Sequence, residues 1–209
     1  MLVPSMILNT SAYMFAASNR LRLRAASVHL HSFAFHIPLD SSIYHQQMSY
    51  LYQATVDYIQ SVLDHETETE DFLKYCTQFP FQMLLSATSA LLRILNSSFA
   101  ENINRNHGRT LFNSAILAIQ RTSVQAFDIA DRVAGTMLRM WRAWGSGGLG
   151  VATFVGNPDE MLHLTIRSRM SMSHVFDLVW VWKMRISTRE RPSGNGKRPL
   201  LQRISMLTI

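Results

Sequence analysis

Hydrophobic residues recur at intervals of three and four positions along most of this chain, which is the spacing of one face of an α-helix. The repeat is clearest in five stretches, residues 44–62, 81–99, 109–121, 128–144 and 172–182. Short alternating segments bounded by turns, the pattern of β-strands, do not form a series. The spacing therefore predicts an all-α, multi-helix fold.

Residues that start or stop helices separate these stretches. Pro80 suits the first turn of the second helix, which is the most apolar and is predicted to lie at the centre of the core. Residues 106–108, Asn-His-Gly, are interpreted as the end of that helix or the turn after it. Asp128 is predicted to cap the fourth helix, and residues 157–160 have the pattern of a further helix start. The acidic run 64–71 is interpreted as a solvated loop or helix entry.

The last helical stretch contains two of the four tryptophans. Its predicted apolar face consists of Met172, Val175, Phe176, Val179 and Trp182. Trp180 and Trp182 cannot share one helix face, because residues two apart diverge. We therefore expect one of the two to pack in the core and the other to lie against a second element or at an interface.

The net charge of +6 is unevenly placed along the 209 residues. Residues 185–209 contain six Lys or Arg and one acid, whereas residues 1–184 contain 14 and 13. The body is therefore nearly neutral and lacks the clustered basic face of a DNA-binding domain. The basic end is interpreted as a solvated tail, with a nuclear localisation patch as the alternative.

The N-terminal region leaves a second localisation open. No apolar run approaches the roughly 18–20 residues of a membrane span, so we expect no membrane association. Arg20, Arg22 and Arg24 lie close together, and no acid precedes Asp40. This pattern is shared by mitochondrial presequences and by solvated helix ends, so a mitochondrial helical protein is an alternative.

Candidate chemistry is sparse, and the sequence predicts no enzyme. Cys76 is the single cysteine, so the chain has no internal disulfide and no multi-cysteine zinc site; we expect it to be a buried hydrophobic residue. His29, His31 and His36 lack nearby acids and are not expected to bind a metal. The glycine cluster 145–150 lacks the Gly-Lys-Ser ending of a phosphate loop. We expect no cofactor and identify no small-molecule site.

Several segments, in order, resemble the regulatory region of fungal binuclear zinc-cluster transcription factors. The similar branch contains the activators of leucine biosynthesis and of secreted protease genes. The matching residues are 23–33, 82–85, 92–101, 108, 111–116, 121–124, 164–173, 176–177 and 180–183. The most distinctive piece joins a Ser/Arg/Met run to an aromatic block, and its signature residues are Arg167, Ser168, Arg169, Ser171, Ser173, Asp177, Trp180 and Trp182.

The resemblance implies three parts. These are a poorly defined N-terminal segment over residues 1–19, a partial helical regulatory domain over 20–187 and a basic tail over 188–209. It implies structural or interaction roles for the signature residues. The family's zinc belongs to a six-cysteine cluster that this chain, with one cysteine, cannot contain. Zinc binding and direct DNA binding are therefore not carried over to any residue here, and DNA would be reached only through a domain that this chain lacks.

The resemblance implies a regulator of transcription in the nucleus, truncated on its N-terminal side. The expected partners are a second copy of the chain or the transcription machinery. A non-catalytic helical interaction protein or decayed paralogue is the alternative. Helices that pack on missing neighbours should leave apolar patches on the surface, which favours self-association.

Overall fold

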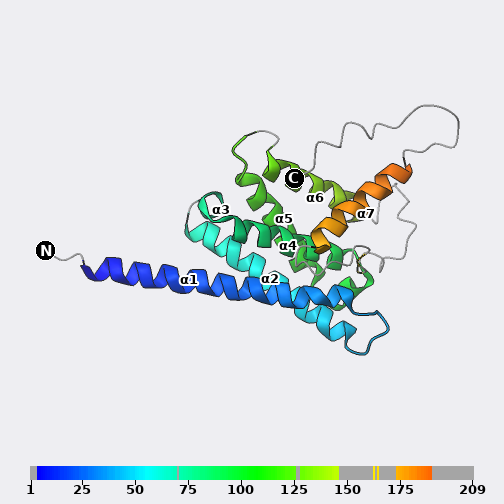
Figure 1. The fold of residues 1–209 in the computed structure, drawn as a ribbon, viewed down its shortest axis with the longest axis horizontal. Coiled ribbons are helices and arrows are strands. Elements are labelled where there is room, and N and C mark those ends of the chain that lie inside the picture. Colours follow the sequence, from blue (N-terminus) through cyan, green and yellow to red (C-terminus); the bar gives the residue numbers. More distant parts are fainter. Residues whose placement is uncertain are drawn as a thin grey trace.

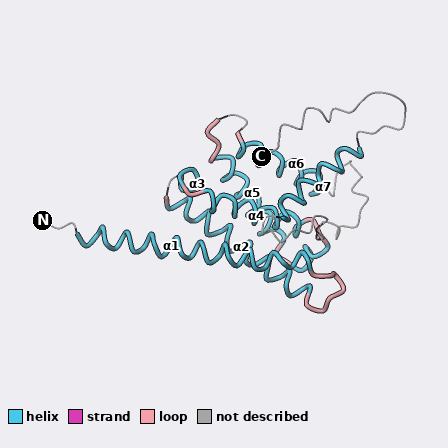
Figure 2. The backbone as a smooth tube through the Cα atoms, viewed as in Figure 1, coloured by secondary structure: helices cyan, strands magenta, loops and turns pink. Residues whose placement is uncertain are grey.

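The fold is all-α, as the spacing predicts. The computed structural model describes residues 4–69, 71–125, 128–145, 162, 164 and 173–189, of which 4–17, 144–145 and 185–189 are described by their backbone alone. Within these residues the chain forms seven α-helices and two 3-10 helices and no strand (Figures 1 and 2). They are α1 (Pro4–His31), η1 (Ser32–His36), α2 (Tyr44–Glu68), α3 (Phe72–Tyr75), α4 (Gln78–Leu95), η2 (Ser98–Asn102), α5 (Arg105–Arg121), α6 (Ile129–Gly145) and α7 (Ser173–Arg189).

The helices pack around α4, which contacts α2, α5 and α7. α1 and α2 lie side by side and antiparallel, joined through η1, and the N-terminal end of α1 projects past the other helices (Figure 1). α2 packs on α4, α4 on α5 and α5 on α6. α7 packs on α4 although more than seventy residues separate them in sequence. No helix in the described residues combines the length and apolar character that crossing a membrane requires.

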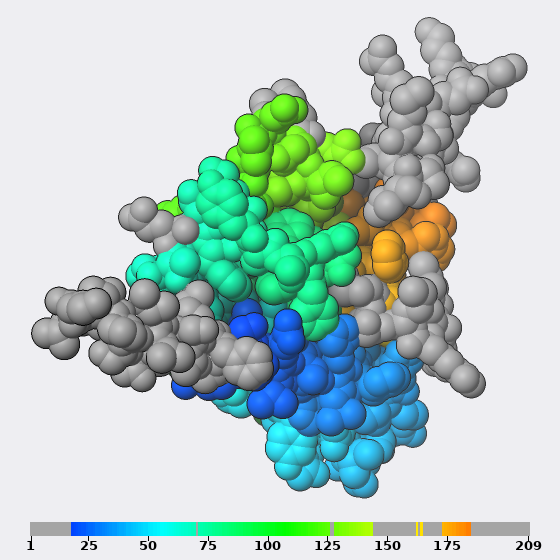
Figure 3. Space-filling model, turned by 60° about the vertical axis from the view of Figure 1, so that its left-hand side comes forward, coloured from blue at the N-terminus to red at the C-terminus, as the bar shows by residue number. Residues whose placement is uncertain are grey.

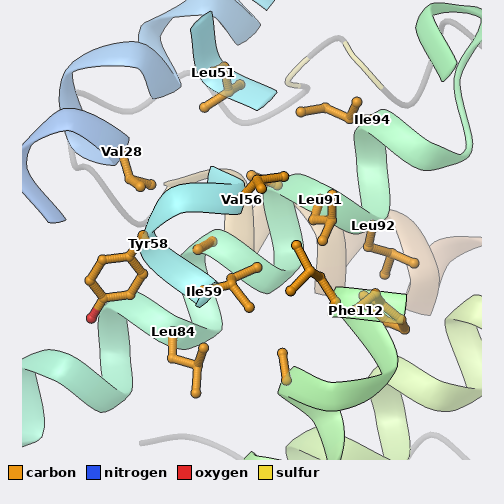
Figure 4. Close-up of a cluster of buried hydrophobic side chains, with 14 of the residues drawn as sticks. Val28, Leu51, Val56, Tyr58, Ile59, Leu84, Leu91, Leu92, Ile94 and Phe112 are labelled. Atoms are coloured by element: carbon orange, nitrogen blue, oxygen red, sulfur yellow. The ribbon is translucent and has the colours of Figure 1, made fainter. Parts of the chain in front are cut away.

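α4 is the centre of the core, as its apolar sequence predicts. From Met83 to Leu95 every side chain except that of Leu85 is buried. Figure 4 shows Leu84, Leu91 and Leu92 of this helix among side chains from the neighbouring helices. A helix buried on nearly all sides must also satisfy its polar groups, and Thr88 and Ser89 do so by donating to the carbonyl oxygens four residues earlier.

α2 confirms the predicted helix over residues 44–62 and extends it. The predicted apolar face is buried throughout: Tyr44, Met48, Leu51, Tyr52, Thr55, Ile59 and Val62. The interpretation of the acidic run as a loop or helix entry is wrong for residues 64–68, which form the last turns of α2. Glutamate propagates helices well, and Glu66 Oε2 accepts a 2.8 Å hydrogen bond from the backbone N–H of Leu73. This bond ties the end of α2 to α3.

α5 corrects the interpretation of residues 106–108 as a helix end. α4 ends at Leu95, and α5 begins at Arg105, four residues earlier than predicted. Asn104 is the cap, because its Oδ1 accepts a 3.1 Å hydrogen bond from the backbone N–H of His107. Gly108 therefore lies within the first turn of α5. It permits close packing there, since a Cβ at this position would lie 2.9 Å from Leu95 Cδ2.

Replacing Gly135 of α6 by alanine is expected to raise the free energy of unfolding by up to about 1 kcal/mol, because alanine is the better helix former. A Cβ at Gly135 would meet no atom within 4 Å. Gly108→Ala gains the same helix propensity but overlaps Leu95, so we expect it to be less stable than Gly135→Ala by about 1–3 kcal/mol. Urea unfolding of both variants tests this. Equal stability of the two would show that the close approach of α5 to α4 has no effect.

Asp128 caps α6, as predicted. Its Oδ1 accepts from the backbone N–H of Asp131 at 3.0 Å, and its Oδ2 accepts from that of Val124 at 2.9 Å. These bonds favour the ionised carboxylate and lower the pKa of Asp128 to about 2. The helical spacing predicts that Ala130, Val133, Met137, Met140, Trp141 and Trp144 form the buried face of α6. Ala130, Met137 and Met140 are buried, and Val133 and Trp141 are partly buried against the core.

The lowered pKa of Asp128 predicts a pH dependence of stability. A carboxylate whose pKa is lower in the folded than in the unfolded protein stabilises the fold above its unfolded pKa. That contribution is lost as the pH falls from about 4 toward 2. We expect an NMR titration of the Asp128 carboxyl to give a midpoint near 2, and Asp128→Asn to make stability less dependent on pH in this window. A midpoint near 4 would show that the cap does not form in solution.

Candidate functional site: a buried ion pair between α4 and α7

Arg93 of α4 forms a fully buried ion pair with the signature residue Asp177 of α7. Arg93 Nη2 donates to Asp177 Oδ2 at 2.6 Å, and only 1% and 0% of the two side chains are exposed. The same nitrogen donates to the carbonyl oxygen of His174 at 2.9 Å. Burial lowers the pKa of Arg93 and the carboxylate of Asp177 acts against this, so the guanidinium keeps its charge. The pair joins two helices that are distant in sequence.

His174 forms the second connection between α7 and α4. Its Nε2 lies 3.0 Å from the carbonyl oxygen and 3.1 Å from the hydroxyl oxygen of Ser86. A carbonyl oxygen can only accept, so the contact assigns the proton of the imidazole to Nε2. The Nε2–H therefore donates to Ser86, and His174 cannot act as a base toward the Ser86 hydroxyl in this arrangement.

Phe35 of η1 closes the site from the side of α1 and α2. Its ring centroid lies 5.7 Å from that of His174, and Arg93 Cζ lies 5.8 Å from the Phe35 ring. An arginine near an aromatic face is attracted by the quadrupole of the ring, whose face is partially negative. Phe35 is itself buried, so the site joins three segments of the chain and excludes water.

The face that α7 presents to the core differs from the predicted apolar face at Phe176 and also contains polar residues. The buried residues are Ser173, His174, Asp177 and Leu178, which recur at helical spacing. Phe176, predicted to be buried, is 54% exposed. Val179 and Trp182 are partly buried against the core, as predicted, and the burial of Asp177 follows from its ion pair with Arg93.

The described signature residues lie at different depths. Asp177 and Ser173 are buried, Trp182 is partly buried against the core, and Trp180 is 40% exposed. Trp182 packs against the core, as expected of one of the two tryptophans. Arg167, Ser168, Arg169 and Ser171 lie outside the described residues, as do residues 146–150 of the glycine cluster, the predicted helix start at residues 157–160 and Met172.

Arg93, His174 and Ser86 are residues of this site that sequence reasoning missed. The signal for Arg93 was its position between Leu92 and Ile94 in the most apolar helix. A charge at the centre of an apolar helix is rarely buried without a partner, so it indicates an acid elsewhere in the chain. The two other residues carry no local signal, because serine and histidine are common on helix surfaces.

The other candidate groups do not converge on a reactive site. Cys76 is half-buried rather than fully buried, its Sγ donates to the Leu73 carbonyl at 3.4 Å, and burial raises the pKa of its thiol. A raised thiol pKa disfavours the nucleophilic thiolate. His29 and His31 lie beside the rings of Phe79 and Tyr50, respectively. The described residues contain no group of three or more His, Cys, Asp or Glu that could hold a metal ion.

Comparison with known proteins connects this chain to a yeast regulator. It is 28% identical over 152 residues to Regulatory protein LEU3 of Saccharomyces cerevisiae, and the match covers 64% of this chain and 16% of LEU3. The chain therefore matches less than a fifth of the length of that relative. No protein-family model matches the chain, and no solved structure matches it.

Proposed function

We propose that this chain is a helical regulatory region of a LEU3-like transcription regulator and acts in the nucleus. The observation that carries the proposal is the similarity to Regulatory protein LEU3 over 152 residues. The order of the matching segments and the nearly neutral helical body support it. With a single cysteine the chain supplies no six-cysteine cluster, so it would reach DNA through another domain or another protein.

The ion pair between Arg93 and Asp177 supports a structural role for the signature residues in this function. A wholly buried pair offers no surface to DNA or to a substrate. It instead fixes α7 on α4. The exposed aromatic residues Phe176 and Trp180 of the same helix then lie at a defined position on the surface. Aromatic residues are enriched at protein interfaces, which supports the transcription machinery or a second copy as partner.

Transcription from a reporter tests the proposed function. The full chain is fused to an unrelated DNA-binding domain whose site lies upstream of the reporter. We expect the fusion to change reporter transcription relative to the DNA-binding domain alone. The same fusion carrying Asp71→Asn, a substitution at an exposed ion pair, controls for the effect of a surface substitution. It should change reporter transcription as much as the unmodified fusion does. A fusion that is folded and nuclear but leaves transcription unchanged would contradict the proposal.

DNA binding by the isolated chain provides a second test. Contacts to phosphates release counterions, so specific DNA binding weakens steeply as salt is added. We expect the purified chain to show no such binding. Tight binding to one DNA sequence that falls steeply with salt would place the recognition of DNA in this chain and contradict the proposed division of roles.

A further inference from the structure

The helix α1 carries a second apolar stripe on the face opposite its buried residues. The buried stripe consists of Leu21, Ala25 and Val28. The other, which we call the outer stripe, consists of Leu23, Ala26 and Leu30 of α1 and Phe33 of η1. Leu23, Leu30 and Phe33 are 71%, 67% and 56% exposed. Figure 3 shows this part of α1, in blue, at the surface of the molecule. Leucine side chains so exposed are candidates for an interface.

The outer stripe has the spacing of a coiled-coil seam. Leu23, Ala26 and Leu30 follow one another at steps of three and four, which are the a, d and a positions of a heptad, and Phe33 follows in η1, beyond the end of α1. In this register Arg20 occupies an e position and Arg22 a g position, and both are exposed. These positions flank the seam and contact the e and g residues of a partner helix. Positive charge therefore borders the seam on both sides at its N-terminal end, beside Leu23, whereas the next e and g positions are Ser27 and His29.

The flanking arginines lack acidic partners in the described part of the chain. The ion pairs found there join Lys74 to Asp71 and Arg93 to Asp177, and neither involves α1. No acid precedes Asp40 in the sequence, so α1 contains only basic charges. The charges of Arg20, Arg22 and Arg24 are consequently available to an incoming segment.

Charge selects against a second copy of α1 as the occupant. α1 contains no acid, so a second α1 would offer no complementary charge to Arg20 and Arg22 and would only add positive charge to the interface. Partners of like charge are disfavoured and partners of opposite charge are favoured. The basic residues 185–209 of the same chain, with six Lys or Arg and one acid, are equally mismatched in charge.

We propose that the outer stripe of α1 is a docking site for an amphipathic helix of another protein, one whose apolar seam is flanked by glutamate or aspartate. Leu23 and Leu30 contact the apolar seam of the partner. Arg20 and Arg22 pair with its acidic flanks and set its register. The inference does not depend on the proposed role in transcription, because it follows from the exposure and charge of α1 alone.

Two synthetic peptides test the proposed docking site on the full chain. Both are four-heptad helices with leucine at a and d, one with glutamate and the other with lysine at e and g. We expect the glutamate peptide to bind at least about tenfold more tightly than the lysine peptide in a fluorescence anisotropy titration. The double substitution Arg20→Glu with Arg22→Glu should invert this preference.

The apolar half of the proposal is tested by Leu23→Ser with Leu30→Ser. Both leucines are exposed, so the fold should persist, and we expect binding of the glutamate peptide to weaken at least about tenfold. If this variant loses helicity, the arginine variant alone decides. Equal binding of the two peptides, binding of neither, or a preference unchanged by the arginine substitutions overturns the proposal. Binding to anionic phosphatidylserine vesicles in place of either peptide would also overturn it, since the stripe would then be a membrane surface.

Discussion

Replacing Asp177 by asparagine is expected to lower the free energy of unfolding by about 3–5 kcal/mol. The substitution keeps the shape of the side chain but removes the carboxylate charge that lies 2.6 Å from the guanidinium of Arg93, where both side chains are buried. A loss of this size is a large part of the stability of an ordinary domain. Urea unfolding followed by circular dichroism measures it, provided that the slope with urea stays unchanged.

The matched control for Asp177 is Asp71→Asn, which removes one partner of an exposed ion pair. Lys74 Nζ lies 3.8 Å from Asp71 Oδ2, and the two side chains are 39% and 52% exposed. Asp71 has a left-handed backbone with φ 60°, which asparagine also adopts readily. We expect a change of at most about 1 kcal/mol. Equal losses for the two variants would mean that burial does not set the strength of the Arg93–Asp177 pair.

Phe112→Ala is expected to lower the free energy of unfolding by about 3–5 kcal/mol. Phe112 is fully buried on α5, and its ring centroid lies 5.0 Å from that of Trp141 on α6. Figure 4 shows Phe112 beside the core residues of α4. Truncation removes the ring from the junction of three helices and leaves a cavity that neighbouring side chains fill only in part. Urea unfolding compares this variant with the wild type.

Leu117→Ala is the control for Phe112, because Leu117 lies on the same helix and is exposed. We expect its effect to stay within about 0.5 kcal/mol. If Phe112→Ala were as mild as this control, α5 would not pack between α4 and α6 as described.

The helices that the sequence predicted well are those whose buried face is apolar. α2 and α4 follow the period of 3.6 residues closely, and their predicted faces are buried almost without exception. A local pattern suffices for them, since burying apolar side chains is the dominant favourable term. The cap at Asp128 was predicted for a similar reason, because a side chain that bonds the nearby backbone acts within one turn.

The features that local patterns could not predict depend on residues far apart in the chain. The residues around Gly108 predict a helix end, but Gly108 lies inside α5. The close packing of Leu95 against this position, which leaves no room for a Cβ, explains the glycine there. From its neighbours alone, the single acid Asp177 in an apolar helix would be expected to face solvent. Its burial depends on Arg93, eighty-four residues earlier, and no periodicity connects the two. The resemblance identified Asp177 as a signature residue, but only the structure shows that it pairs with Arg93.

The similarity to LEU3 and the fold contribute different parts of the functional account. The similarity concerns a regulator and covers 64% of the chain. The fold explains what one signature residue does, since Asp177 attaches α7 to the core. The exposed residues of α7 and of α1 are the surfaces that these helices offer to a partner.

A double-mutant cycle on Arg93 and Asp177 tests most directly whether this pair holds α7 on α4. Arg93→Met and Asp177→Leu are measured singly and together by urea unfolding. Each single variant removes one charge of the buried pair and keeps the other, whereas the double variant removes both, and apolar replacement of a buried pair is often neutral. We predict that the double variant recovers most of the loss, with a coupling free energy of about 2–3 kcal/mol. A loss in the double variant equal to the sum of the two single losses would show that the side chains do not interact, and would contradict the account.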